Sequence, residues 1–320
     1  MIEIRHLSKR FGNLRAVDDV SLEIREGEIF AILGPNGSGK TTTLKCVAGL
    51  ASPSSGEIRV NGHDISRNAV EAKRQFSYLP QRLAFPEVLT AEEVLEFHCR
   101  LRRLPLERAQ RALAYSKFDG FGTRPVKEFS GGMIQRLGIA LLSLADSPVL
   151  LLDEPTTGLD PEACAGLREL LVAGRNRGKT VLLTSHILAE VEELADRVAI
   201  LVQGRLVTVQ PVTSLRRQLM TATRLRIDLL NPSDDFVAIV QHAGARSAGL
   251  SGACLRVSTN AEFRVAILRA LEDAGAVIER FSTEEASLEE IYMRYVYESA
   301  APDPLAAGRV PSRGTSPRIH

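Results

Sequence analysis

A glycine-rich stretch near the N-terminus carries the residues best suited to bind phosphate. It comprises Gly34, Pro35, Asn36, Gly37, Ser38, Gly39, Lys40, Thr41 and Thr42, and it fits the pattern G-x-x-x-x-G-K-[ST]. The glycines let the backbone curl so that successive amides face inward and form an anion cradle. At this spacing Lys40 is expected to reach the β- and γ-phosphates of a nucleotide, and the Thr41 hydroxyl to ligate Mg²⁺.

Two acidic residues form a second candidate site. Asp153 and Glu154 follow directly on an apolar run from Val149 to Leu152. Parallel sheets place ligand groups at the carboxyl ends of their strands. We therefore expect Asp153 to hold Mg²⁺, directly or through water, and Glu154 to orient and polarise an attacking water molecule. Combined with the phosphate cradle, this pair indicates hydrolysis of a nucleotide.

The elements that must position these residues alternate between strand and helix patterns. Buried strands are predicted at Glu28–Leu33, Val149–Leu152, Thr180–Thr184 and Arg197–Val202, and helices at Gly39–Leu50, Pro161–Arg177 and Ile187–Ala195. Such alternation is typical of an α/β fold with a parallel sheet covered on both faces. Strands at Ile2–Leu7, Ala16–Ile24 and Glu57–Val60 indicate a small antiparallel piece on this core. The stretch from Ala91 to Ala145 has a mostly helical pattern.

The chain is predicted to contain a second, smaller domain. After about Arg224 the strand patterns are Leu225–Leu230, Cys254–Ser258 and Val277–Ser282, and the helix patterns are Asp234–His242, Ala261–Ala274 and Ser287–Glu298. Ser287 and Glu290 have the spacing of a capping box. We expect an α+β domain over residues 221–299 and, from its proline-rich composition, a disordered tail over residues 300–320.

Composition and charge narrow the functional class. Hydrophobic residues make up 44% of the 320 residues and charged residues 25%, which are ordinary values for a globular protein. The net charge of +1 gives no electrostatic reason to expect nucleic-acid binding. No apolar run approaches the ~20 residues that span a bilayer, and no signal peptide is evident. We expect a cytoplasmic protein with reduced cysteines.

Further motifs, in order along the chain, resemble those of ABC-transporter ATPases. Ser130, Gly131 and Gly132 precede a helix as in the family's signature motif, and Tyr78-Leu-Pro-Gln81 resembles the Q-loop. Asp160 resembles the D-loop aspartate, His186 the switch histidine, and Phe11 the aromatic that stacks on adenine. The resemblance covers residues 1 to about 220 and implies a P-loop NTPase core with antiparallel β and helical subdomains.

The resemblance also implies cofactors and partners. ATP and Mg²⁺ would bind, with Gln81 linking Mg²⁺ and water to the membrane-facing segment and His186 contacting the γ-phosphate. The Ser130 helix end would face the ATP of a second subunit, so two chains, more simply a homodimer, would complete the sites. A transmembrane permease would be driven from the inner face of the membrane. Its contact surface is expected between Gln81 and Phe97.

The segment from Glu285 to Tyr292 resembles the closing part of ABC-2-type exporter ATPases, with a weaker similarity to the ATPase of copper-site maturation in nitrous-oxide reductase. This favours export. Two alternatives stay open from the sequence. One is a soluble ABC ATPase of DNA repair or translation, disfavoured by the short Gln81–Ser130 segment and the single cassette. The other is a non-hydrolysing scaffold, disfavoured by the presence of Glu154.

Overall fold

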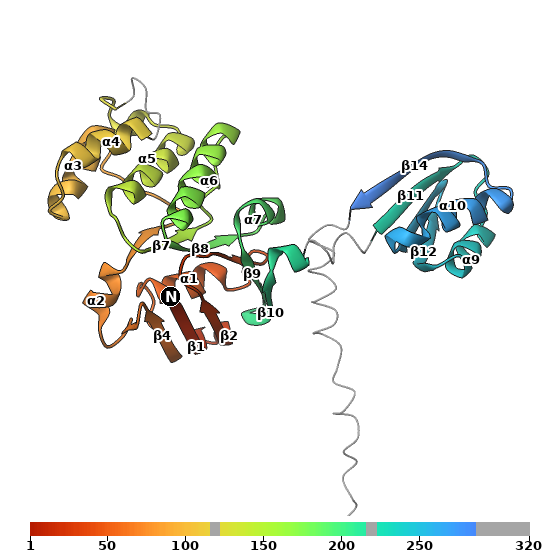
Figure 1. Ribbon diagram of the computed structural model, residues 1–320, viewed down its shortest axis with the longest axis horizontal. Coiled ribbons are helices and arrows are strands. Elements are labelled where there is room, and N and C mark those ends of the chain that lie inside the picture. The colour runs from red at the N-terminus through yellow and green to blue at the C-terminus, as the bar shows by residue number, and fades with distance from the viewer. Residues whose placement is uncertain (116–121, 216–222, 286–320) are drawn as a thin grey trace, which may run out of the picture. The chain divides into compact units, whose positions relative to one another are not determined.

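The chain contains two compact units. Its computed structural model describes residues 1–115, 122–215 and 223–285. Contacts within the chain separate Met1–Arg217 from Gln218–His320. The first unit contains two sheets and the second unit one, each unit has its own hydrophobic core, and Figure 1 shows their helices and strands. None of the described helices combines the length and the apolar character that a membrane crossing requires.

A six-stranded sheet in the order β10-β9-β3-β8-β7-β6 forms the centre of the first unit. Its strands are β3 (Ile29–Leu33), β6 (Phe76–Leu79), β7 (Val149–Asp153), β8 (Thr180–Ser185), β9 (Arg197–Val202) and β10 (Arg205–Pro211). Neighbours from β9 to β6 are parallel, and β10 is antiparallel to β9. Strands β3, β7 and β8 are buried throughout, which explains their uninterrupted apolar runs. The predicted parallel core is confirmed.

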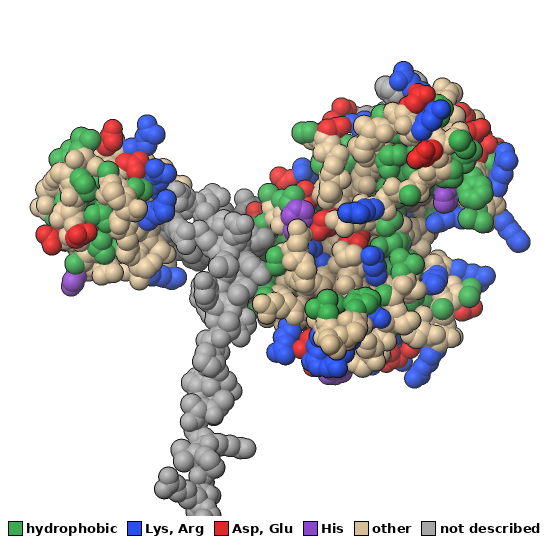
Figure 2. Space-filling view, turned by 180° about the vertical axis from the view of Figure 1, so that it is seen from behind, with side chains coloured by type: hydrophobic (Ala, Val, Ile, Leu, Met, Phe, Trp, Pro, Cys, Tyr) green, Lys and Arg blue, Asp and Glu red, His purple; other side chains and the backbone are tan. Residues whose placement is uncertain are grey.

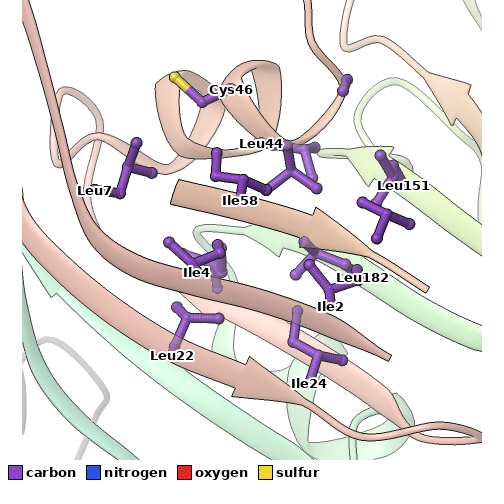
Figure 3. Packing of buried hydrophobic residues seen from close by; sticks show 14 of the residues in the cluster. Ile2, Ile4, Leu7, Leu22, Ile24, Leu44, Cys46, Ile58, Leu151 and Leu182 are labelled. Atoms are coloured by element: carbon purple, nitrogen blue, oxygen red, sulfur yellow. The ribbon is translucent and has the colours of Figure 1, made fainter. Parts of the chain in front are cut away.

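An antiparallel sheet, β2-β1-β4-β5, packs on this core, as the sequence predicts. Its strands are β1 (Ile2–Phe11), β2 (Leu14–Ile24), β4 (Ser55–Val60) and β5 (His63–Asp64). The inward-facing side chains of β1, β2 and β4 pack with α1 (Lys40–Val47) and with Leu151 and Leu182 of the parallel sheet (Figure 3). This cluster anchors the glycine-rich stretch, because the last three residues of that stretch form the start of α1.

Three helices form a separate lobe of the first unit (Figure 1): α3 (Ala91–Leu101), α4 (Glu107–Tyr115) and α5 (Gly131–Leu144). A capping box between Thr90 and Glu93 starts α3. Val94, Leu95 and Leu137 belong to a core that these helices share. The described part of the unit also contains α2 (Ala69–Arg74), α6 (Pro161–Asn176) and α7 (Leu188–Leu194).

The second unit is a four-stranded antiparallel sheet with helices packed on one face. Along the chain its elements are β11 (Thr223–Leu229), α9 (Asp235–His242), β12 (Ala245–Ser251), β13 (Cys254–Thr259), α10 (Arg264–Asp273) and β14 (Ile278–Glu285). The strand order β12-β13-β11-β14 is that of the ferredoxin-like split β-α-β arrangement. On the face away from the core, Arg226 and Arg256 are exposed and directly opposite one another. Figure 2 shows basic side chains gathered on one side of this unit.

Some boundaries differ from the predicted ones for local reasons. Helix α1 ends at Val47 rather than at Leu50, because Gly49 adopts φ 63° and closes a Schellman motif. In that motif the Gly49 amide donates to the Cys46 carbonyl and the Leu50 amide to the Lys45 carbonyl. The predicted helix Ala261–Ala274 begins instead as a 3₁₀ turn over Ala261–Phe263. The predicted helix Ser287–Glu298 and the tail lie outside the described residues.

Candidate active site

The glycine-rich stretch forms the turn from β3 into α1. Gly39 caps the helix with φ 100°, and a Cβ there would lie 2.5 Å from the carbonyl oxygen of Ala16. A Cβ on Gly34 would lie 2.3 Å from the carbonyl oxygen of Leu201. Only glycine fits at these two positions, because the loop is pressed between β2 and β9. Asn36 and Gly37 are exposed at the tip of the loop.

Lys40 lies buried beneath this loop, with 4% of its surface exposed. Its Nζ donates to the carbonyl oxygens of Gly34 at 2.8 Å and Pro35 at 3.1 Å, and it lies 3.6 Å from Oε1 of Glu154. Burial lowers the pKa of Lys40, and the carboxylates of Glu154 and Asp153 oppose that shift. A buried cation at the base of a ring of backbone amides suits a polyanionic ligand such as a triphosphate.

Asp153 has the surroundings of a metal ligand. Its Oδ1 accepts hydrogen bonds from the hydroxyls of Thr41 and Thr184, both at 2.8 Å. Its Oδ2 is buried and has no hydrogen-bond partner among the described residues. Buried carboxylate oxygens are normally satisfied, so this oxygen points to an additional ligand. A carboxylate oxygen beside the hydroxyl of Thr41 fits Mg²⁺, which prefers hard oxygen ligands.

Glu154 follows the end of β7 with a left-handed backbone, φ 47°. Its amide donates to the hydroxyl of Thr184 at 2.9 Å. Its carboxylate Oε2 accepts from Nε2 of Gln81 at 2.9 Å and lies 3.4 Å from Nδ1 of His186. The side chain of Glu154 is 7% exposed, whereas that of His186 is 41% exposed. The sequence places Gln81, Glu154 and His186 far apart along the chain, and the ends of β6, β7 and β8 bring them together.

The signature residues lie at the start of α5. The hydroxyl of Ser130 caps this helix by accepting from the amide of Met133 at 3.3 Å, and Ser130 and Gly131 are exposed. A Cβ on Gly132 would lie 3.2 Å from the carbonyl oxygen of Gly158. The residues of this helix start therefore contact the segment that leads to Asp160.

Asp160 caps α6 and joins it to α5. Its Oδ1 accepts from the amide of Ala163 at 2.8 Å, and its Oδ2 accepts from the guanidinium of Arg136 at 2.6 Å. These two interactions, led by the Ala163 amide, hold the pKa of Asp160 below its usual value. In addition, Nε2 of Gln135 donates to the carbonyl oxygen of Pro155 at 2.9 Å. The signature helix is thus attached to the segment that follows Glu154.

The other predicted nucleotide contacts lie around the cradle. Phe11 ends β1 with 53% of its surface exposed, and Nζ of Lys9 is 4.8 Å from the centre of its ring. Phe11 is opposite Leu14 in the hairpin that leads to Ala16, the residue pressed against Gly39. Ser38 is buried in the loop with an unpartnered hydroxyl among the described residues, and Thr42 is half-buried in the first turn of α1.

Three residues that the sequence analysis did not single out hold the site together: Thr184, Gln135 and Arg136. Thr184 both donates to Asp153 and accepts from Glu154, which fixes the two acids relative to each other. The sequence contains one signal for Thr184, a hydroxyl side chain near the end of the mostly apolar strand β8. Gln135 and Arg136 lie in α5, whereas their partners, Pro155 and Asp160, lie between β7 and α6. Only the folded structure reveals these pairings.

Comparison with known proteins identifies relatives over most of the chain. A family model described as "ABC transporter" matches residues 17–157. The uncharacterized ABC transporter ATP-binding protein YcbN of Bacillus subtilis (strain 168) is 32% identical over 301 residues, or 92% of this chain and 97% of YcbN. The Nod factor export ATP-binding protein I of Burkholderia orbicola (strain AU 1054) is 38% identical over 208 residues, or 64% of this chain and 68% of that protein.

A solved structure shares both the fold and part of the sequence. It is a dimeric ATP-binding cassette in a post-hydrolysis state, bound to ADP and Pi. The match has a TM-score of 0.61 and 26% identity, and it covers 66% of this chain and 99% of the other.

Proposed function

The chain belongs to the ABC transporter ATP-binding proteins and is an ATPase subunit, and from that premise we propose that it powers export through a separate permease. The observation that carries the hydrolytic part of this proposal is the arrangement around Glu154. Its buried carboxylate is held by Gln81, lies beside His186, and lies 3.6 Å from the phosphate-binding Lys40. A carboxylate with these neighbours is placed to activate water next to a bound triphosphate.

Each site residue then has a distinct role. The amides of the Gly34–Thr42 loop and Lys40 grip the phosphates, and Phe11 stacks on adenine. Glu154 orients and polarises the water that attacks the γ-phosphate. Gln81 and His186, which contact the Glu154 carboxylate from opposite loops, hold that carboxylate in place and sense the γ-phosphate.

Mg²⁺ would be held by the oxygens of Thr41 and Asp153 and by the amide oxygen of Gln81, whose Nε2 donates to Glu154. The unpartnered Oδ2 of Asp153 supports this assignment. When bound, the ion neutralises phosphate charge during transfer. Removal of divalent metal with EDTA should stop hydrolysis, and Mg²⁺ should restore it. Asp153→Asn should raise the Mg²⁺ concentration that is needed. Hydrolysis that persists in EDTA would contradict the metal assignment.

The active form is proposed to be a dimer, and more simply a homodimer. Ser130 and Gly131 are exposed at the start of α5 and Gly132 is half-buried, and this helix end would face the ATP of a second chain. The dimeric relative bound to ADP and Pi supports this assembly. Asp160 of the D-loop accepts a hydrogen bond from Arg136 of α5, which attaches it to the same helix.

The membrane partner is proposed to dock between Gln81 and Phe97. Val88 and Phe97 are 79% and 56% exposed, and Phe85 packs partly on the helical lobe. Exposed apolar residues suit a surface that binds another protein. Because Gln81, at one end of this segment, contacts Glu154, a partner bound there would respond to the presence of ATP in the site. The relative named for Nod factor export supports the direction of transport. We place the subunit in the cytoplasm, at the inner face of the membrane.

Copurification tests the proposed function against its alternatives. The tagged chain, extracted in mild detergent, should bring down a multi-span membrane protein, and ATP hydrolysis by that complex should exceed that of the chain alone. Recovery of ribosomes or DNA instead would favour a soluble ABC ATPase. No hydrolysis in either preparation would favour a scaffold.

A further inference from the structure

Glu190 connects the two loops that carry the proposed catalytic residues. It lies in the first turn of α7, and its Oε2 accepts two hydrogen bonds. The hydroxyl of Thr156 donates at 2.7 Å, and the hydroxyl of Ser185 donates at 3.1 Å. Thr156 is two residues after Glu154, and Ser185 directly precedes His186. One carboxylate oxygen on a third element therefore joins both loops.

The two loops leave neighbouring strands at the same level of the sheet. Asp153 of β7 is paired with Thr184 of β8. The amide of Glu154 is bonded to the Thr184 hydroxyl at that level, and strands β7 and β8 end there, at Asp153 and Ser185. Glu190 supplies the next connection outward, between Thr156 and Ser185. It therefore sets the separation of the loops where their catalytic side chains face each other.

His186 depends on its backbone for its position. Its side chain is 41% exposed, so packing does little to place the ring. Ser185 is buried, and its hydroxyl also accepts from the amide of Ile187 at 3.0 Å. The residues on both sides of His186 are thus fixed by one hydroxyl, which is itself bonded to Glu190. The Thr156 bond, at 2.7 Å, has the length of a strong hydroxyl–carboxylate bond, whereas the Ser185 bond is longer, at 3.1 Å, and its hydroxyl also lies 3.3 Å from the carbonyl oxygen of Ile187.

We propose that Glu190 is a positioning residue that holds His186 against Glu154 for hydrolysis. This inference rests on the proposed function, because it assigns a role within the same site. Glu190 is hydrogen-bonded to the two loops, and the proposed function assigns it no contact with ATP or with the attacking water. It acts through the Thr156 and Ser185 hydroxyls, so its loss should slow turnover more than it weakens ATP binding.

The test measures kcat and KM for ATP with the full-length chain. Glu190→Ala should lower kcat about tenfold to a hundredfold and change KM less than about threefold. Glu190→Gln keeps an acceptor oxygen and should restore kcat to within about threefold of wild type. Thr156→Val preserves shape but removes one donor, and it should lower kcat by a smaller factor. The double variant Glu190→Ala/Thr156→Val should be no slower than Glu190→Ala, because both act on one contact.

Glu193→Ala is the matched control. Glu193 lies on the same helix, is exposed, and pairs with Arg168 of α6. It should keep the wild-type kcat. Equal losses of kcat in Glu190→Ala and Glu193→Ala would show that helix stability causes the effect, and this would overturn the inference. A wild-type kcat in Glu190→Ala or in Thr156→Val would also overturn it. If Glu190→Ala does not fold, Thr156→Val decides alone. An inactive wild-type protein would instead contradict the proposed function.

Discussion

Glu154, the residue proposed to activate water, has an unfavourable left-handed backbone conformation. A non-glycine residue with positive φ is uncommon, and such strain persists only where the surroundings enforce it. Here the enforcing contacts are the Thr184 hydroxyl on its amide and Gln81 on its carboxylate. The turn directs the carboxylate away from β7 towards His186. We interpret the strain as the means by which a strand end presents a side chain to bound nucleotide.

Substitutions at Lys40 and His186 should separate binding from turnover. Lys40→Ala removes the buried cation beneath the cradle and should abolish tight ATP binding. His186→Ala leaves the cradle intact and should preserve binding while hydrolysis falls by at least about a hundredfold. Equilibrium binding of a fluorescent ATP analogue and steady-state phosphate release measure the two quantities. Hydrolysis at the wild-type rate in His186→Ala would show that the histidine has no switch role.

The sequence was informative wherever a residue type is tied to a fixed spacing. Lys40, Asp153 and Glu154 could be assigned from local patterns, because Lys40 follows a glycine turn and the two acids lie at the end of a strand. Glu190 could not be assigned, because one glutamate among several on a helix has no distinguishing local pattern. Its partners Thr156 and Ser185 belong to other elements, and only the pairing of β7 with β8 brings them together.

At the scale of elements, burial decided which strands were predictable. Strands β3, β7 and β8 are buried on both faces and have continuous apolar runs. Strands β6, β10 and β12 were not predicted, and each lies at an edge of its sheet. In β12 the sequence Ala-Arg-Ser-Ala-Gly-Leu-Ser contains no β-branched or aromatic residue. Such an edge strand forms because its neighbour β13 supplies hydrogen bonds, and that information is not local.

Strand β6 offers a test of packing beside the site. The hydroxyl of Tyr78 is buried and has no partner within the described ranges, and burial together with the charge of Asp153 raises the pKa of Tyr78 to about 12. The unfolded chain loses this proton near the ordinary value of 10.0, so the Tyr78 contribution to stability falls as pH rises from about 10 to 12. Tyr78→Phe should be neutral or stabilising at pH 7, and its advantage should grow above pH 10.

Urea denaturation of both proteins at pH 7 and pH 10.5 measures this difference. The free energy of unfolding should fall less for Tyr78→Phe than for wild type between the two conditions. Identical pH dependence would mean that folding does not raise the pKa of Tyr78, and a clear loss of stability at pH 7 would mean that the hydroxyl has a partner in solution.

At the scale of the whole molecule, the chain joins two units that fold around separate cores. Val149 and Leu182 belong to the core of the first unit, and Leu225 and Ile267 to that of the second. All the proposed nucleotide contacts fall within the first unit. We propose that residues 1–220 act as the ATPase domain, residues 221–299 as an accessory domain and residues 300–320 as a tail outside both.

Calorimetry can test whether nucleotide stabilises one unit alone. Two unfolding transitions are expected. A non-hydrolysable ATP analogue with Mg²⁺, at ~100 times its Kd, should stabilise one of them by about 2.7 kcal/mol and leave the other unchanged. The Lys40→Ala variant serves as the control and should show no shift. A single transition, or an equal shift of both, would mean that the units unfold together.

The central claim is that two chains share each ATP, and the oligomeric state of Glu154→Gln tests it most directly. This substitution keeps size and hydrogen bonding but removes the charge that polarises water. Light scattering after size exclusion should show a lasting dimer in ATP and a monomer without it. Adding Ser130→Arg should prevent dimerisation while each chain still binds ATP. A monomeric Glu154→Gln protein in saturating ATP, or a double variant that still dimerises, would contradict the account.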